Sequence, residues 1–277
     1  MSEALPKTER IQPSKVKENL RTRILGQPVL YFRILTSTND IAKELAVRGI
    51  NEGTVVVAET QTTGKGRFKR EWTSPEAGLW FSIILKPNVP LKQAPKLTLL
   101  ASVAVAKTIN RLYGLRSEIK WPNDVLIDRK KVCGILTEGQ IVGETLGFAI
   151  LGIGINANFN IGAFPTRLKE AATTLREELG RKIERETLLC EVLAEIESYY
   201  ELLRRGRFEV ILDDWRRLAG FLGAYVEIDC DGRRIQGWAV DVDDDGALIV
   251  RLKDKTLLRV ISGDVVKVVQ KTYPKHV

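Results

Sequence analysis

The chain of 277 residues is long enough for one large domain and a smaller second one. Apolar residues make up 44% of it and charged residues 28%, as in an ordinary soluble globular protein. No apolar run is long enough to span a bilayer, and residues 1–10 lack the apolar core of an export signal, so the sequence predicts a cytoplasmic protein without membrane contact. The net charge of +8 favours an anionic ligand, nucleic acid or an acidic protein as partner, although it also suits solubility alone.

Cysteine and histidine usage excludes several kinds of chemistry. Cys133, Cys190 and Cys230 lie far apart, which argues against a disulfide framework or a Cys-x-x-Cys metal site, and the first two are expected to be buried thiols. The single histidine, His276, stands next to the end of the chain. Ser–His or Cys–His nucleophiles and His-ligated zinc are therefore excluded, so any reaction must depend on Lys, Arg, carboxylates, amides and a hard metal ion such as Mg²⁺.

The first half of the chain alternates between strand and helix patterns. Residues 14–25 predict a short helix, 28–35 a strand, and 36–48 a helix that stops at Gly49. Further predicted elements are strands at 54–58 and 78–85, a helix at 91–113, strand character over 118–127, a turn at 128–130, paired strands at 131–138 and 144–155, and a loop at 156–160. Because proline cannot donate within a ladder, Lys120 and Trp121 are expected at a strand end.

The second half ends in a small β module. Helices are predicted at 168–179, 186–205 and 208–218, with Gly206 and Gly220 as helix-end glycines. From residue 224 apolar residues alternate, and Asp-Gly pairs punctuate them as hairpin turns, which predicts a compact barrel. We expect residues 1–27 to be an N-terminal extension, 28–220 the main domain and 221–277 the β module.

The link between the second and third strands contains the most informative motif. Residues 64–70 hold four cations and two glycines, and Trp72 follows. Glycines let backbone N–H groups approach phosphate, Lys and Arg neutralise it, and a nearby aromatic ring could cover a base. The alternative is a solvated basic loop without a ligand.

Two further motifs leave alternatives open. Lys120, at the start of Lys-Trp-Pro-Asn-Asp, could face a developing negative charge, while Asn123 and Asp124 could hold Mg²⁺; otherwise the strand simply ends in a proline turn. The side chains of residues 37–39 could cap the following helix or bind a small polar ligand. Residues 152–157 match G-x-G-x-x-A, but a loop follows where a dinucleotide-binding fold needs a helix, so that interpretation is rejected, and no P-loop motif is present.

Taken together, these motifs resemble the biotin protein ligases. The matching segments occur in the family's order: Ser37-Thr38-Asn39; Gln61; Gly64-Lys65-Gly66-Arg67 with Trp72 and Ser74-Pro75; Lys120-Trp121-Pro122-Asn123-Asp124; Lys131 with Gly134-Ile135-Leu136; and Gly152-Ile153-Gly154-Ile155-Asn156. The chain departs from the family loop G-R-G-R-x-G-R-x-W at two positions, where Lys65 replaces arginine and Lys69 replaces glycine. The first change loses a bidentate fork, and the second bears on the closed shape of the loop.

The resemblance implies an α+β fold with a mixed, mainly antiparallel sheet flanked by helices, like class II aminoacyl-tRNA synthetases, and a C-terminal SH3-like β-barrel. It implies that biotin and MgATP form biotinyl-5′-adenylate, from which biotin passes to a lysine of a biotin carboxyl carrier protein. It also implies a homodimer. Since only residues 1–27 precede the first strand, we expect a ligase without operator DNA binding.

The resemblance also implies roles for residues of this chain. Lys120 and Arg67 are the implied catalytic residues. The implied biotin-binding residues are Ser37, Thr38, Asn39, Gln61, Gly64, Lys65, Arg67, Lys120, Gly134 and Leu136. The implied ATP and adenylate residues are Arg67, Arg70, Trp72, Lys120, Asn123, Lys131 and Asn156. Magnesium is placed near Asn123 and Asp124.

Repulsion among the cations of residues 64–70 predicts a loop that is mobile until an anion arrives. Two rival functions stay open, a lipoate–protein ligase with the same architecture and a basic nucleic-acid-binding protein that uses the C-terminal barrel. The latter should interleave aromatics with cations on the barrel, where Tyr225 and Trp238 have few clustered Lys or Arg.

Overall fold

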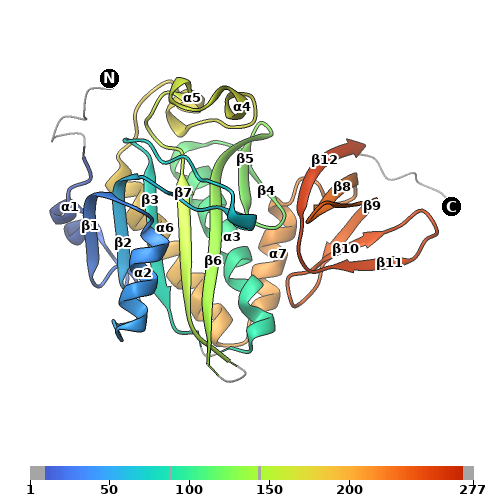
Figure 1. The fold of residues 1–277 in the computed structure, drawn as a ribbon, viewed down its shortest axis with the longest axis horizontal. Helices are drawn as coiled ribbons and strands as arrows, with labels where there is room; N and C mark the ends of the chain where they lie inside the picture. The colour runs from blue at the N-terminus through green and yellow to red at the C-terminus, as the bar shows by residue number, and fades with distance from the viewer. Residues whose placement is uncertain (1–9, 88, 143–144, 271–277) are drawn as a thin grey trace.

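The computed structural model describes residues 10–87, 89–142 and 145–270, so His276 lies outside the described residues. A seven-stranded sheet with the order β1-β2-β3-β7-β6-β5-β4 forms the centre of the larger unit (Figure 1). Its strands are β1 (Val29–Leu35), β2 (Val55–Gln61), β3 (Leu79–Leu85), β4 (Ser117–Lys120), β5 (Asp124–Ile127), β6 (Lys130–Val142) and β7 (Thr145–Ile155). β1 and β2 are parallel and all other neighbours are antiparallel, which confirms the mixed, mainly antiparallel sheet.

Helices cover both faces of this sheet. They are α1 (Pro13–Asn19), α2 (Thr38–Val47), α3 (Ala94–Tyr113), α4 (Thr166–Lys169), α5 (Leu175–Leu179), α6 (Arg185–Arg204) and α7 (Phe208–Leu218), with short 3₁₀ turns η2 (Arg67–Lys69), η3 (Leu91–Gln93) and η4 (Ile161–Ala163). Figure 1 shows α2 in front of the sheet and α3, α6 and α7 behind it. α3 buries most of its length in the core, as its apolar spacing predicts, and ends at Gly114, which adopts the left-handed conformation (φ 67°).

Two helices were predicted with the wrong boundaries. The helix expected at 14–25 ends at Asn19, because the carboxylate of Glu197 accepts the backbone N–H groups of residues 23–25 at 2.7–2.8 Å. The helix expected at 168–179 is divided into α4 and α5. Between them, Lys131 exchanges backbone hydrogen bonds with residues 171 and 173, and Thr174 caps α5 by accepting from the backbone N–H of Glu177. In both cases a long-range contact replaces helical hydrogen bonds.

The strand character over 118–127 resolves into a tight hairpin. β4 ends at Lys120 and β5 begins at Asp124, where the two residues pair directly across the ladder. Lys120 therefore stands at a strand end, as predicted. The turn between them carries Trp121, whose buried Nε1 donates to the carbonyl oxygen of Gly246 at 3.1 Å.

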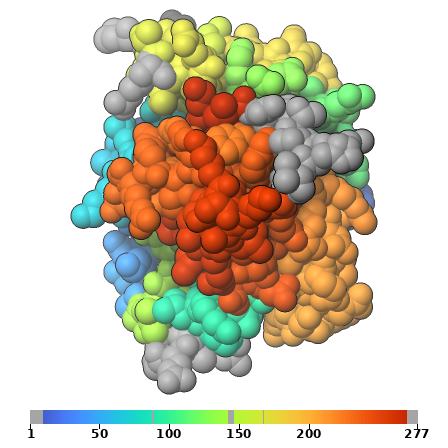
Figure 2. Space-filling model, turned by 90° about the vertical axis from the view of Figure 1, so that its right-hand side faces the viewer, coloured from blue at the N-terminus to red at the C-terminus, as the bar shows by residue number. Residues whose placement is uncertain are grey.

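The C-terminal residues form a second, five-stranded antiparallel sheet of SH3-like type. Its strands are β8 (Tyr225–Cys230), β9 (Arg233–Val242), β10 (Leu248–Arg251), β11 (Leu257–Val260) and β12 (Asp264–Gln270), in the order β11-β10-β9-β8-β12. Asp231 and Gly232 form the predicted hairpin turn, both with positive φ (55° and 87°). Figure 2 shows this sheet covering one side of the molecule, with parts of the larger unit around its rim.

Among the residues that the structure describes, no helix combines the length and the apolar composition needed to cross a membrane. The described cysteines are free thiols, and Cys133 and Cys190 are buried as predicted. Burial raises the pKa of Cys190 to about 11.

A buried ion pair connects the N-terminal segment to the core. Arg185 on α6 pairs with Glu59 on β2 at 2.9 Å, and both side chains are almost wholly buried. The Glu59 carboxylate also accepts from the backbone N–H of Ile11 (2.6 Å) and from the Tyr31 hydroxyl (3.2 Å). This one carboxylate thus joins the N-terminal segment, β1, β2 and α6.

We expect Glu59→Ala to lower the free energy of unfolding by about 3–5 kcal/mol, because it leaves a buried guanidinium without its counter-charge. Glu18→Ala, on the exposed side of α1, is the matched control and should change it by less than about 0.5 kcal/mol. Urea unfolding measures both values. Equal losses in the two variants would show that the buried pair contributes nothing of its own.

Candidate active site

A cavity of about 410 Å³ opens beside residues 134–136 of β6 and residues 152–154 of β7. Its walls come from the start of α2, the end of β2, the basic loop that follows β2, the β4–β5 turn, β6, β7, α4 and β12. Every residue that the sequence placed in a binding or catalytic role lines this cavity, with the exception of Gly64. Gly64 lies at its edge, where a Cβ would stand 2.3 Å from the carbonyl oxygen of Trp72. The structure therefore brings motifs from distant parts of the chain to one place.

Sequence reasoning missed several wall residues. These are Phe164, Leu168, Ala171 and Ala172 around α4, Ile153 on β7, and Asp264, Val265 and Val266 on β12. The helix pattern over 168–179 and the β pattern after residue 224 carried no signal of the cavity. Only the fold brings these segments to it.

Three glycines of β6 and β7 create the floor of the cavity. A Cβ at Gly152 would lie 2.1 Å from Asn39 Oδ1, and a Cβ at Gly154 would lie 2.5 Å from Trp72 Nε1. A Cβ at Gly134 would lie 2.8 Å from the Trp72 ring. The glycines of the G-x-G-x-x-A segment thus let these side chains lie directly on the sheet, and the rejection of a dinucleotide-binding fold is consistent with the loop that follows β7.

Hydrogen-bonded side chains organise one end of the cavity. Gln61 Oε1 accepts from the backbone N–H of Thr38 at 2.8 Å and from its hydroxyl at 3.1 Å. Ser82 donates to Asn39 Oδ1 at 2.6 Å, and Asn39 Nδ2 donates to Glu138 at 2.7 Å. The donors and acceptors at this end are fixed before any ligand enters.

The helix-capping interpretation of residues 37–39 was wrong. α2 begins at Thr38, within the helix predicted over 36–48, but Ser37, its N-cap residue, makes no side-chain capping bond. Ser37 is buried and lines the cavity instead. The polar-ligand alternative is the one that this geometry favours.

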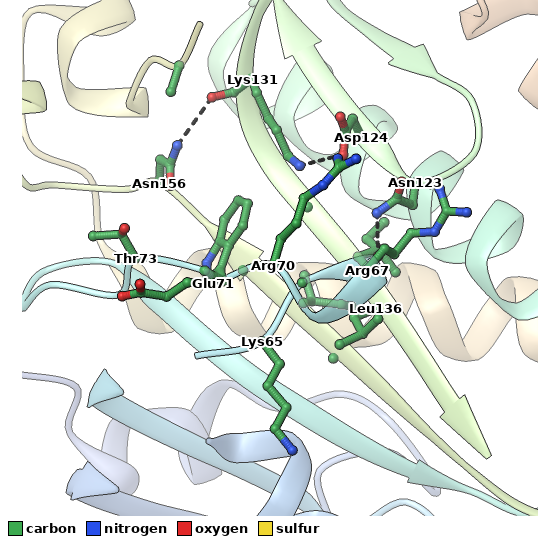
Figure 3. Close-up of a pocket in the computed structure, with 18 of the residues that line it drawn as sticks. Lys65, Arg67, Arg70, Glu71, Thr73, Asn123, Asp124, Lys131, Leu136 and Asn156 are labelled. Carbon is green, nitrogen blue, oxygen red and sulfur yellow. Dashed lines mark hydrogen bonds and ion pairs between the residues drawn. The ribbon is translucent and has the colours of Figure 1, made fainter. Parts of the chain in front are cut away.

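Two ammonium groups share one carboxylate in the middle of the cavity. Asp124 pairs with Lys131 at 2.6 Å (Figure 3). It also pairs with Lys120 at 3.0 Å. Burial opposes ionisation of Asp124, but Lys131 and Lys120 outweigh it and hold the pKa of this carboxyl below its usual range. Asn123 Nδ2 donates to the carbonyl oxygen of Ile135 at 2.8 Å, which fixes the amide beside this cluster.

These residues do not fit a resident magnesium ion. An ion at Asp124 would stand beside two ammonium groups that already neutralise the carboxylate. Within the part of the chain that the structure describes, no three His, Cys, Asp or Glu side chains gather as metal ligands. The placement of Mg²⁺ at Asn123 and Asp124 therefore has no support in this geometry.

The basic loop after β2 is held at both ends. Lys65 pairs with Asp40 on α2, and Figure 3 shows it turned away from the other labelled side chains. Arg67 and Arg70 both pair with Asp264 on β12, each at 2.7 Å. Three of the four loop cations thus have carboxylate partners without a ligand, so uncompensated repulsion is not a reason for this loop to be mobile.

The opposite end of the cavity is aromatic and contains two unpartnered polar atoms. The Trp72 ring packs edge-on to Trp80, with centroids 6.3 Å apart, and Lys131 Nζ lies 4.9 Å from its centroid. Asn156 Nδ2 donates to the carbonyl oxygens of Lys131 (3.2 Å) and Thr173 (2.9 Å), so the orientation of the amide is fixed. Asn156 Oδ1 and Trp72 Nε1 are buried without partners among the described residues. Trp72 Nε1 lies against the backbone of Gly154. Buried polar groups without a partner are rare, which makes Asn156 Oδ1 a candidate acceptor for a ligand.

Comparisons with known proteins agree with this site. The biotin/lipoate A/B protein ligase family matches residues 31–156, and the biotin protein ligase C-terminal domain matches residues 222–268. The bifunctional ligase/repressor BirA of Bacillus subtilis is 37% identical over 262 residues, which cover 94% of this chain and 80% of that protein. The biotin–[acetyl-CoA-carboxylase] ligase of Mycobacterium tuberculosis is 27% identical over 270 residues, covering 93% and 97%.

A solved structure of a biotin protein ligase also resembles this chain. The biotin protein ligase from Aquifex aeolicus, in complex with biotin and ATP, superposes with a TM-score of 0.74 at 29% identity, covering 86% of this chain and 97% of that one. The sheet, the basic loop and the small C-terminal sheet thus define a member of the biotin and lipoate ligase class. Within that class the chain belongs to the biotin protein ligase family, which confirms the resemblance and makes it an ATP-dependent ligase.

We expect Asp124→Asn to lower the free energy of unfolding by about 1–3 kcal/mol near pH 7, because two ammonium groups lose their shared carboxylate. The folded-state pKa lies below the unfolded value of about 3.9, so this contribution is present above that value and is lost as pH falls through the folded pKa. Urea unfolding near pH 7 and near pH 3 should therefore show a smaller difference between the two proteins in acid. A difference that is constant or larger in acid would contradict this assignment.

Proposed function

We propose that this ligase activates biotin with MgATP to biotinyl-5′-adenylate and then transfers biotin to a lysine of a biotin carboxyl carrier protein. One observation carries the proposal: a single cavity joins a preorganised polar end to an aromatic end through a central group of cations. Biotin and ATP fit this order of polar end, central cations and aromatic end. The small polar ring system of one substrate and the nucleobase of the other lie on either side of two anionic groups. The complex of the Aquifex aeolicus relative with biotin and ATP supports it.

The polar end is proposed to hold the biotin rings. Ser37, Thr38 and Gln61, with the backbone of Lys65, supply donors and acceptors for the ureido group. The valeryl chain would run along β6 past Gly134 and Leu136, where the lack of a side chain at the glycine leaves space. Asn39 shapes this end through its bonds to Ser82 and Glu138.

The central cations are proposed to bring two anions together. A carboxylate oxygen of biotin attacks the α-phosphorus of ATP, and the bond to the pyrophosphate leaving group breaks. Lys120, Lys131 and Arg67 would neutralise the carboxylate and the phosphate, which otherwise repel each other, and Asp124 keeps the two ammonium groups in place. Magnesium would arrive on the triphosphate as part of the substrate.

In the second step the amine of the acceptor lysine attacks the acyl carbonyl carbon. AMP leaves, an amide bond forms, and the amine proton passes to solvent. Water must be excluded from the mixed anhydride until then, and the basic loop over the cavity would serve this purpose. We also propose that the protein acts in the cytoplasm and, following the resemblance, that it is a homodimer. The catalytic unit is proposed to end at residue 220 and the C-terminal unit to begin at residue 221.

Mass spectrometry of a carrier domain, incubated with the protein, biotin and MgATP, tests the reaction. We expect a gain of one biotinyl group that requires ATP. Lys120→Ala should keep the fold but reduce adenylate formation about 100-fold or more, because one counter-charge to the joining anions is lost. Lys43→Ala, exposed on α2, is the matched control. A carrier modified by lipoate instead of biotin would overturn the substrate, and near-normal pyrophosphate release by Lys120→Ala would overturn the role of Lys120.

The unpartnered Asn156 Oδ1 generates a second test. We assign it to the exocyclic amino group of adenine, because the amide orientation leaves Oδ1 as an acceptor without a partner and Asn156 lines the cavity. Replacing ATP with purine riboside triphosphate, which lacks that amino group, should weaken binding to the wild type about 10-fold or more. Asn156→Ala should bind both nucleotides alike. Discrimination that persists in the variant would assign the acceptor to another group.

A further inference from the structure

The outermost residues of the basic loop have an unfavourable backbone conformation. Phe68 and Lys69 both lie in the left-handed region, with φ of 53° and 58°. For residues with side chains this region costs roughly 1–2 kcal/mol each. Strain of this kind is found preferentially at functional sites. A glycine at position 69, as in the family's loop pattern, would remove part of it, yet this chain has lysine there.

The Phe68 ring is held outward and exposed. Its side chain is 41% exposed, and it is absent from the lining of the active-site cavity. The guanidinium carbons of Arg67 and Arg70 lie 4.8 and 5.6 Å from the ring centroid. Because Asp264 fixes both arginines, the ring rests on a rigid support and would lose little freedom on binding a partner.

The loop separates two cavities. Its inner side borders the active site, whereas Phe68 and Lys69 line a second cavity of about 680 Å³ together with Leu136 and Glu138. Lys69 is exposed and has no ion-pair partner among the described residues. The outer face of the loop therefore offers an aromatic ring beside a free ammonium group, next to the place where an adenylate would be covered.

We propose that Phe68 and Lys69 form a docking point for the acceptor protein, whose surface beside the target lysine would present an apolar recess and acidic side chains. This rests on the proposed function, because a protein that delivers a lysine to a covered adenylate must touch the cover. A rigid exposed aromatic residue is a common binding hot spot. Lys69, within a chain of net charge +8, complements an acidic partner.

Steady-state kinetics with a recombinant biotin carboxyl carrier domain tests the docking point. Phe68→Ala should raise the KM for this domain about 10-fold, as loss of a hot spot does. ATP–pyrophosphate exchange and adenylate capture by hydroxylamine, which needs no docking, should each change less than about 2-fold. Lys69→Glu should raise the KM at low salt and much less at about 0.5 M salt, where surface charges are screened. Val240→Ala, an equally exposed apolar residue on β9, is the control and should leave the KM unchanged.

The outcomes separate this proposal from the reaction itself. Normal exchange with an unchanged KM for the carrier domain in both loop variants overturns the docking point alone. ATP–pyrophosphate exchange that falls in parallel with carrier modification also overturns the docking point, because Phe68 and Lys69 would then act on biotin and ATP. A wild-type protein without ATP–pyrophosphate exchange overturns the proposed function as well.

Discussion

Charge compensation inside one cavity is the constraint on which the site depends. Lys120, Lys131, Arg67 and Arg70 line it, and among the described residues two carboxylates, Asp124 and Asp264, pair with these four cations. Each carboxylate is shared by two cations, which leaves an excess of two positive charges. That excess suits a reaction that joins two anions, because the positive charge offsets the repulsion between the two substrates.

The sheet makes room for the charged and aromatic side chains of the cavity by having glycines where space is needed. Glycines on β6 and β7 let Trp72 and Asn39 lie against the backbone, and each would clash with a Cβ at its position. Those glycines weaken the strands locally, and the long β6–β7 ladder and the buried strand β3 compensate for them. The sheet itself is thus the floor of the cavity, and loops, α4 and β12 complete its walls.

Local patterns were enough to predict most strands, the long helices α3, α6 and α7, and the clustering of the motifs. They could not predict Asp264 as a partner of Arg67, because nothing in the alternation of β12 distinguishes a cavity carboxylate from a surface one. The helix over 14–25 failed for a similar reason. Its periodicity is helical, but Glu197, far along the chain, binds the backbone instead. Residues 37–39 are a similar case. The local capping rule was plausible there, but the tertiary contacts of Thr38 and Asn39 prevailed.

The contacts of Trp121 explain why the small C-terminal sheet is part of the site rather than an appendage. The side chain lies buried in the turn between two cavity residues, Lys120 and Asn123, and donates to the carbonyl oxygen of Gly246 in the turn between β9 and β10. Arg67 makes a second connection, to the carbonyl oxygen of Gly263 at 2.9 Å and to Asp264. The turn that positions the ammonium group and the loop that covers the cavity are thus both anchored on the same sheet. A shift of that sheet would move Lys120 and Arg67 together, so the two groups proposed to face the same anions keep their spacing because a third element holds both.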